Sequence, residues 1–169
     1  MLRAILTIAA CLLLALAGCG GGDDSSSSTE STAEAGASAK SPEAGSLQEK
    51  PKVTVPKGAP PEQLEAEDLI EGEGAEAKAG DEVTVQYVGV NYKTGKEFDA
   101  SWDRGEPFAF QLGAGMVIPG WDQGVEGMKV GGRRELIIPP ELGYGSTGSP
   151  PAIPPNETLV FVVDLVEVN

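Results

Sequence analysis

The sequence predicts an α+β fold in which several antiparallel strands accompany a single short helix. Through most of the C-terminal two thirds of the chain, apolar residues alternate with polar ones, which is the period of a half-buried β-strand. Only one segment has apolar residues at helical spacing, and turn-rich stretches separate the elements. The 169 residues allow one such domain with additional segments, and the composition places these segments at the N-terminus.

Residues 1–18 are predicted to be a lipoprotein signal peptide. Arg3 gives a positive start, and AILTIAACLLLALA is apolar for about 14 residues, fewer than the roughly 20 that a membrane-spanning helix needs. The run ends in Leu-Ala-Gly-Cys, which resembles the lipobox of bacterial lipoproteins and predicts that Cys19 carries a lipid anchor. The alternative is an ordinary secretory signal that contains a cysteine.

Residues 19–51 are predicted to be a disordered linker. They are rich in Gly, Ser, Ala, Asp and Glu and contain almost no large apolar residue, so burial cannot offset the entropy of ordering them. Such a linker holds the following domain, residues 52–169, away from the membrane. We therefore expect an extracytoplasmic protein that contacts the bacterial cell membrane only through its lipid anchor.

The composition excludes several kinds of chemistry. The chain has no histidine, and its two cysteines, Cys11 and Cys19, fall in the signal peptide and at the anchor. Serine–histidine and cysteine–histidine catalysis and zinc sites of histidine or cysteine are thereby excluded, and no cofactor or metal is expected. The formal net charge of −14 argues against nucleic acid as a partner. Nothing in the sequence indicates an oligomer, so a monomer is expected.

The strands follow from period-two alternation. Residues 83–87 alternate apolar with polar, and a turn then leads back into residues 97–99. Residues 108–112 alternate strongly, and residues 134–138 form a further strand that two prolines end. Residues 158–168 are apolar on both faces, which is typical of a central strand.

The single helix is predicted over residues 121–128. Trp121, Val125 and Met128 fall at positions i, i+4 and i+7 of this segment and therefore share one face. Two internal glycines lower its helix propensity, so tertiary packing has to stabilise it. Ahead of the main domain, Val53 and Val55 are compatible with an additional edge strand.

Aromatic residues make up only 5% of the chain, yet they occur on nearly every predicted element of the domain. Periodicity alone leaves two interpretations open: an ordinary aromatic core, or a pocket. Three features favour a pocket. Asp99 places a carboxylate beside Phe98 at a strand end, Tyr144 lies in a glycine-rich loop, and Trp121 follows a Pro-Gly at the start of a helix.

Several motifs then occur in a specific order. They are QYVG, KEFDAS, EPFAFQLG, VIPGWDQGVEGMKVGG, RELIIPPELGYGSTGSP and IPPNETLVFVVDLVEV. In order and spacing they resemble the FKBP-type peptidyl-prolyl cis–trans isomerases, from about residue 64 to the C-terminus. The resemblance implies a curved antiparallel β-sheet wrapped around one short α-helix, with an apolar pocket between the two.

The resemblance also implies which residues form the site. The residue matching Trp121 is the pocket floor, on which a substrate proline rests, and the Tyr144 hydroxyl matches a hydrogen-bond donor to ligand carbonyls. The positions implied to be catalytic are Tyr87, Phe98, Asp99, Trp121, Tyr144 and Phe161. The positions implied to bind substrate are Phe108, Val117, Ile118 and Ile153. Ser149 and Ala152 differ from residues that eukaryotic members often carry on the same loop.

The implied function is a peptidyl-prolyl cis–trans isomerase, or rotamase. It accelerates Xaa–Pro isomerisation in exported unfolded polypeptides by binding the twisted amide in an apolar aromatic pocket. FK506-type macrolides are the implied inhibitors. The alternative is a non-catalytic module or chaperone that uses the same pocket to bind proline-containing peptides. A complete pocket favours the enzyme, because loss of Trp121, Phe98-Asp99 or Tyr144 would have favoured the module. A purely structural domain would leave Asp99 and the Tyr144 loop unexplained.

Overall fold

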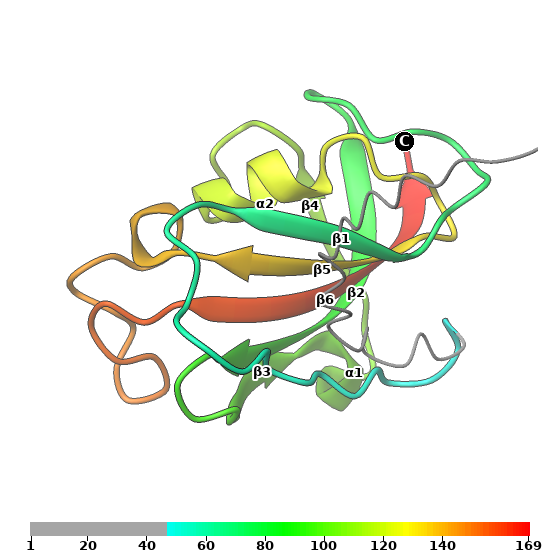
Figure 1. Cartoon of the computed structure of the whole chain (residues 1–169). Helices are drawn as coiled ribbons and strands as arrows, with labels where there is room; N and C mark the ends of the chain where they lie inside the picture. Colours follow the sequence, from blue (N-terminus) through cyan, green and yellow to red (C-terminus); the bar gives the residue numbers. More distant parts are fainter. Residues whose placement is uncertain (1–46) are drawn as a thin grey trace, which may run out of the picture. The chain divides into compact units, whose positions relative to one another are not determined.

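The computed structural model describes residues 47–169, which form an antiparallel sheet with short helices (Figure 1). The elements are β1 (Glu65–Ile70), β2 (Glu82–Asn91), β3 (Glu97–Ala100), α1 (Ser101–Arg104), β4 (Phe108–Gln111), α2 (Pro119–Val125), β5 (Arg133–Ile138), the 3-10 turn η1 (Pro140–Leu142) and β6 (Leu159–Val168). None of the helices in this described part has the length and apolar character needed to cross a membrane.

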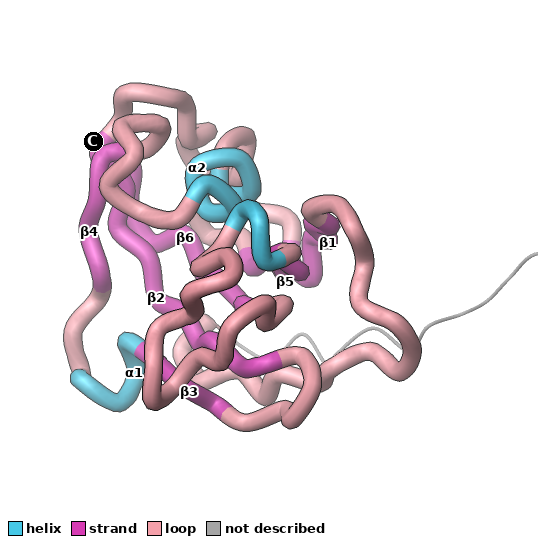
Figure 2. Tube along the Cα trace, turned by 90° about the vertical axis from the view of Figure 1, so that its left-hand side faces the viewer, coloured by secondary structure: helices cyan, strands magenta, loops and turns pink. Residues whose placement is uncertain are grey.

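The sheet has the strand order β1-β5-β6-β2-β3, and β4 pairs with β2 beside this path. All pairings are antiparallel. β6 lies between β5 and β2 and is buried along most of its length, which confirms the prediction of a central strand. β3 and β4 share β2: β4 pairs with Glu82–Val85 and β3 with Val88–Val90. Figure 2 shows β4 at the margin of the sheet.

The helix α2 lies against one face of the sheet (Figures 1 and 2). The predicted range, 121–128, begins and ends too late. Pro119 suits the first turn because its missing N–H has no helical partner there, and Gly127 leaves the helical region with a φ of 78°. A Cβ on Gly120 would lie 2.4 Å from the Ile138 side chain. This glycine, unfavourable for helix formation, therefore lets α2 approach β5 closely.

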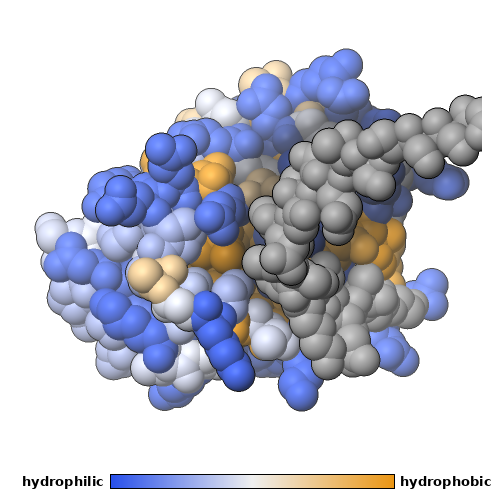
Figure 3. Space-filling view, in the orientation of Figure 1, coloured by the Kyte–Doolittle hydropathy of each residue, from blue (hydrophilic) through white to orange (hydrophobic). Residues whose placement is uncertain are grey.

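The sheet buries a separate apolar cluster on each face. The first-face cluster, under α2, consists of Ala77, Val83, Val85, Tyr87, Phe110, Leu112, Trp121, Val125, Met128, Leu136, Ile138, Ile153, Leu159, Phe161, Val163 and Leu165. The second-face cluster consists of Val88, Val90, Tyr92, Ala100, Ile137 and Val160, with Val53, Val55 and Trp102 packed against it. On the side drawn in Figure 3, hydrophilic side chains cover most of the visible surface, and apolar ones show mainly in its middle.

The edge strand considered for Val53 and Val55 is wrong, because residues 51–60 form no strand. Both valines instead pack onto the second-face cluster. Prolines at 51 and 56 flank them, and each lacks the N–H that a strand ladder uses. The two valines therefore add apolar packing to the face of the sheet and no strand to its edge.

Two elements have little signal in the sequence. β1 reads EAEDLI and is mostly exposed, so it shows no alternation of apolar and polar residues. Its place is set by β5, where Arg134 Nε lies 2.6 Å from an Asp68 carboxylate oxygen. α1 is a single turn that Gly105 ends with a φ of 71°.

The predicted signal peptide, the anchor position Cys19 and most of the predicted linker lie outside the described residues. The last part of the linker is described, and it contacts the domain. Lys50 Nζ lies 2.9 Å from a carboxylate oxygen of Glu97 and 2.6 Å from one of Asp103. Arg133 donates a hydrogen bond of 3.2 Å to the Glu49 carbonyl.

Candidate functional site

A cavity of about 500 Å³ opens on the first face, beside the N-terminus of α2. Its lining combines aromatic rings, aliphatic side chains and one carboxylate. The lining residues are Tyr87, Phe98, Asp99, Phe108, Met116, Val117, Ile118, Pro119, Trp121, Tyr144 and Phe161. The fold therefore brings every sequence-predicted pocket residue except Ile153 to one cavity, from strands, a helix and two loops.

Trp121 is held at the base of this cavity by other rings. Its side chain is 4% exposed, and its ring lies 5.0 Å from Tyr87 and 5.3 Å from Phe161, centroid to centroid, both at 85°. Phe110 and Phe108 follow at 5.6 and 6.2 Å. Edge-to-face contacts of this kind contribute about 0.5–1.5 kcal/mol each beyond area burial. The ring is therefore a rigid surface.

Phe98 and Phe161 form the next wall, and a glycine makes room for them. Their ring centroids lie 5.5 Å apart at 89°. A Cβ on Gly89, on β2, would lie 2.6 Å from the Phe161 ring and 2.7 Å from the Phe98 ring. We did not predict this residue from the sequence. The available signal was the position of this glycine inside a strand, which marks a site where another group approaches the backbone closely.

A hydrogen-bonded group forms the polar edge of the cavity. The Tyr87 hydroxyl donates to Asp99 Oδ2 at 2.5 Å, and Arg104 Nη2 donates to the Tyr87 oxygen at 2.8 Å. Arg104 Nη1 completes the group by pairing with Asp99 Oδ1. Sequence reasoning missed Arg104; its place in the turn directly after β3 was the available signal. Both oxygens of Asp99 are thereby engaged.

Both tyrosines of the cavity have a pKa above the usual value of a tyrosine. Burial raises the pKa of Tyr87 to about 12, and the hydrogen bond to Asp99 acts in the same direction. Burial also raises the pKa of Tyr144, with the negative charge of Asp99 adding to the effect. Tyr144 is 40% exposed, and its hydroxyl makes no hydrogen bond within residues 47–169. At neutral pH it is a free donor at the rim.

Three positions differ from the predicted set. Ile153 lies in the first-face cluster and not in the cavity lining. Ser149 and Ile153 exchange backbone hydrogen bonds of 2.8 and 2.9 Å, which fold their loop back toward the core. Met116 and Pro119 also line the cavity, and Met116 is 67% exposed.

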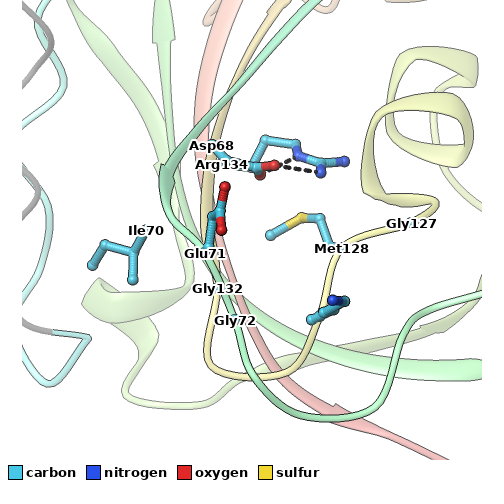
Figure 4. Close-up of a pocket in the computed structure, with 9 residues that line it drawn as sticks. Asp68, Ile70, Glu71, Gly72, Gly127, Met128, Gly132 and Arg134 are labelled. Carbon is cyan, nitrogen blue, oxygen red and sulfur yellow. Dashed lines mark hydrogen bonds and ion pairs between the residues drawn. The ribbon is translucent and has the colours of Figure 1, made fainter. Parts of the chain in front are cut away.

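A smaller cavity of about 230 Å³ lies between β1, β5 and the C-terminal end of α2 (Figure 4). It is polar, and two of its charged side chains, Asp68 and Arg134, are paired with each other. Arg134 forms two hydrogen bonds with the Asp68 carboxylate and donates to the carbonyls of Gly124 and Glu126. This arginine ties α2 to the sheet. Within the described chain, no three Asp, Glu, Cys or His side chains are grouped so as to hold a metal ion.

The family model and the known proteins that resemble this chain agree with one another. The family model described as FKBP-type peptidyl-prolyl cis-trans isomerase matches residues 73–166. An FK506-binding protein of Streptomyces anulatus is 62% identical over 121 residues, which cover 71% of this chain and 98% of that protein. A probable FK506-binding protein of Corynebacterium glutamicum is 53% identical over 118 residues, or 70% of this chain and 98% of that protein.

Solved structures agree in fold. FkpA from Escherichia coli matches with a TM-score of 0.58 and 48% identity, covering 63% of this chain and 48% of that one. AtFKBP13 matches with a TM-score of 0.59 and 39% identity, covering 63% of this chain and 93% of that one. The fold, the motifs and these relatives agree, and the chain belongs to the family of FKBP-type peptidyl-prolyl cis–trans isomerases.

Proposed function

We propose that this enzyme isomerises Xaa–Pro bonds in the cavity above Trp121, and that its substrates are exported, unfolded polypeptides. The observation that carries the proposal is the cavity itself, in which an apolar aromatic surface lies beside two protonated phenols. Membership of an isomerase family supports the reaction type.

The reaction is a rotation about an amide bond, so it needs no nucleophile. Resonance sets a barrier of about 18–20 kcal/mol, and the unaided step takes tens of seconds. The twisted transition state has lost the resonance and much of the amide dipole. An apolar surrounding therefore binds it better than the planar ground state. Each factor of ten in rate needs only about 1.4 kcal/mol of this difference.

Each part of the cavity has a proposed role in that rotation. The proline ring lies on Trp121 between the walls of Phe161 and Phe108, which exclude water from the amide. The Tyr144 hydroxyl donates to a substrate carbonyl, and the backbone N–H of Ile118 is a second donor. The prolyl side is held while the preceding carbonyl rotates.

Asp99 acts as an electrostatic and orienting group. Its two oxygens are bound by Tyr87 and Arg104, which leaves it poorly placed to remove a proton. Asp99 and Arg104 bind the Tyr87 hydroxyl and so keep its ring in edge-to-face contact with Trp121. The carboxylate thus shapes one wall and sets the local potential.

The test is a protease-coupled isomerisation assay on a short Xaa–Pro peptide, with the full-length chain in mild detergent. Asp99→Val removes the partner of Tyr87 and Arg104, and Tyr144→Phe removes a donor to the substrate. Each is expected to lower kcat/KM by about tenfold, or about 1.4 kcal/mol in the barrier. Tyr92→Phe is the matched control, because Tyr92 belongs to the second-face cluster. It should leave kcat/KM unchanged.

The same assay separates the alternative function. An FK506-type macrolide is expected to block turnover, in keeping with the FK506-binding names of the relatives. A folded wild-type chain that binds proline peptides without accelerating their isomerisation would instead make this protein a binding module or chaperone.

We further propose that the enzyme is a monomer anchored to the bacterial cell membrane through a lipid on Cys19. The proposal is supported by the apolar N-terminal run, the Leu-Ala-Gly-Cys sequence and the Gly/Ser-rich stretch after it. Labelling with a radioactive fatty acid in a bacterial host tests the anchor. Label should appear in the wild type and be absent from Cys19→Ala, which should leave the membrane fraction. Equal labelling of both would reject the anchor.

A further inference from the structure

We propose that the substrate chain beside the proline leaves the cavity over Met116 and pairs with the free edge of β4. There it enters a second cavity, in which Glu82 favours a basic side chain. This inference rests on the proposed function, since it extends the same site. It assigns an adjoining subsite for the residues that flank the proline, and a preference for their charge.

The two cavities adjoin each other at Met116. The second has a volume of about 580 Å³ and is lined by Gly80, Glu82, Ala109, Phe110, Gln111, Met116 and Asn169. Met116 lines both cavities. Phe108 lines the first and Phe110 the second, and their rings are stacked, with centroids 5.6 Å apart and planes at 22°. A chain leaving the first cavity on this side passes directly into the second.

Met116 is held in place on the loop that joins β4 to α2. Asp122, next to Trp121 on α2, accepts hydrogen bonds from the backbone N–H groups of Gly113 at 2.8 Å and Gly115 at 3.1 Å. A side chain that is both 67% exposed and apolar is therefore presented on an ordered loop. The flexible thioether of methionine suits contact with varied side chains.

The edge of β4 offers backbone groups to a second strand. In the described sheet β4 pairs with β2 alone. The Leu112 N–H donates to the Asp81 carbonyl on the β2 side. Because the direction of hydrogen bonding alternates along a strand, the backbone groups of Ala109 and Gln111 face away from β2. Extended peptides bind such edges by adding a strand.

The charge of the second cavity selects among peptides. Glu82 lies directly opposite Gln111 in the pairing of β2 with β4. It is exposed, and none of the ion pairs within residues 47–169 involves it. The lining contains neither lysine nor arginine. A lysine or arginine of the substrate therefore finds a carboxylate here, whereas an acidic residue is repelled.

The experiment measures kcat/KM for the isomerisation of several peptides by the full-length chain in mild detergent. One peptide is short, and the others extend it by four residues before or after the proline, with either lysine or glutamate in the extension. For extensions on one side, kcat/KM should be about two- to fivefold higher with lysine than with glutamate, the size of a surface ion pair. Glu82→Gln should bring this ratio close to one. A ratio that Glu82→Gln leaves unchanged would overturn the proposal.

A second variant tests the pairing with β4. Ala109→Pro removes an N–H that faces away from β2, so the β2–β4 ladder keeps its hydrogen bonds. The gain in kcat/KM from extending the peptide should be lost in this variant. It should persist in the control Val166→Ser, whose valine is 47% exposed and lines neither cavity. Equal gains in Ala109→Pro and in the wild type would overturn the pairing.

Amide hydrogen exchange tests the pairing of the peptide with β4 independently of activity. The amides of Ala109 and Gln111 should be protected by the extended peptide and not by the short one. Lack of protection by either peptide would again reject the pairing. Failure of the proposed function has a different signature, because the wild type would then not accelerate isomerisation of even the short peptide.

Discussion

The two faces of the sheet differ in how many aromatic rings they bury, and the cavity above Trp121 opens on the first face. The first face carries large aromatic rings that meet edge to face around Trp121. The second buries mainly aliphatic side chains together with Tyr92, and Val53, Val55 and Trp102 pack against them. The first face therefore contributes both core packing and the cavity, whereas the second face contributes packing.

The period of the strands makes this division possible. On β2, Tyr87 belongs to the first-face cluster and the next residue, Val88, to the second. On β6, Phe161 and Val160 divide in the same way. Successive side chains of a strand point to opposite faces, so one strand contributes to both. The comparison predicts that substitutions on the second face change stability and leave catalysis intact.

The largest expected effect is on the second face. Arg133 and Asp164 form a buried ion pair, with Nε at 2.5 Å and Nη2 at 2.7 Å from the two carboxylate oxygens. Asp164→Ala leaves the arginine charge buried without its carboxylate, which is expected to lower the free energy of unfolding by about 3–5 kcal/mol. Urea unfolding measures this. Activity per folded molecule should stay the same, and a loss below about 1 kcal/mol would contradict the prediction.

The next effect separates the two tryptophans. Trp121→Leu removes the floor of the cavity and should lower kcat/KM by about 10- to 100-fold, or about 1.4–2.8 kcal/mol in the barrier. Trp102 packs against the second-face cluster, so Trp102→Leu should destabilise the fold with kcat/KM within about twofold of the wild type. Similar losses of activity in both variants would remove the distinction between the faces.

A smaller effect depends on pH and lies on the second face. Burial raises the pKa of Glu135 to about 7, and the charge of Glu67 across the strand pair adds to it. The folded chain binds this proton more tightly than the unfolded chain, whose value is 4.5. The resulting stability is present in full below about 4.5 and is lost as the pH rises through about 7.

Glu135→Gln should abolish that loss. Between pH 5 and pH 8, the unfolding free energy of the wild type should fall by about 1–2 kcal/mol more than that of the variant. Urea unfolding at the two pH values checks this. Parallel pH profiles would mean that Glu135 is ionised in the folded chain throughout the range.

The smallest effect concerns the segment that joins the domain to the N-terminal residues. Lys50 bridges Glu97 and Asp103, and its hydrogen bond lowers the pKa of Asp103. Because these groups are accessible to solvent, Lys50→Met should cost no more than about 0.5 kcal/mol, and less at high salt. Thermal unfolding at two salt concentrations measures it. A change in kcat/KM would show that this segment influences the site through α1.

Much of the fold was predictable because it depends on local pattern. The alternation at 83–87, 108–112 and 134–138 identified strands, and residues 158–168, which are apolar on both faces, identified the central one. β1 was not predicted, since an exposed, acidic strand has no periodic signal and depends on Arg134 of β5 for its place. The bounds of α2 were misjudged at both ends, because apolar spacing does not reveal that Pro119 begins the helix or that Gly127 has a φ of 78°.

The sequence by itself determined the chemistry available to this protein. Without histidine, and with both cysteines in the N-terminal segments, the domain was limited to aromatic surface, carboxylates and phenols, and its motifs identified the family. Only the tertiary structure decided how these groups meet. It joined Arg104 to Asp99, placed Ile153 in the core and set the exposed Met116 between two cavities. The geometry of these contacts depends on how side chains and elements pack against one another, which no local pattern encodes.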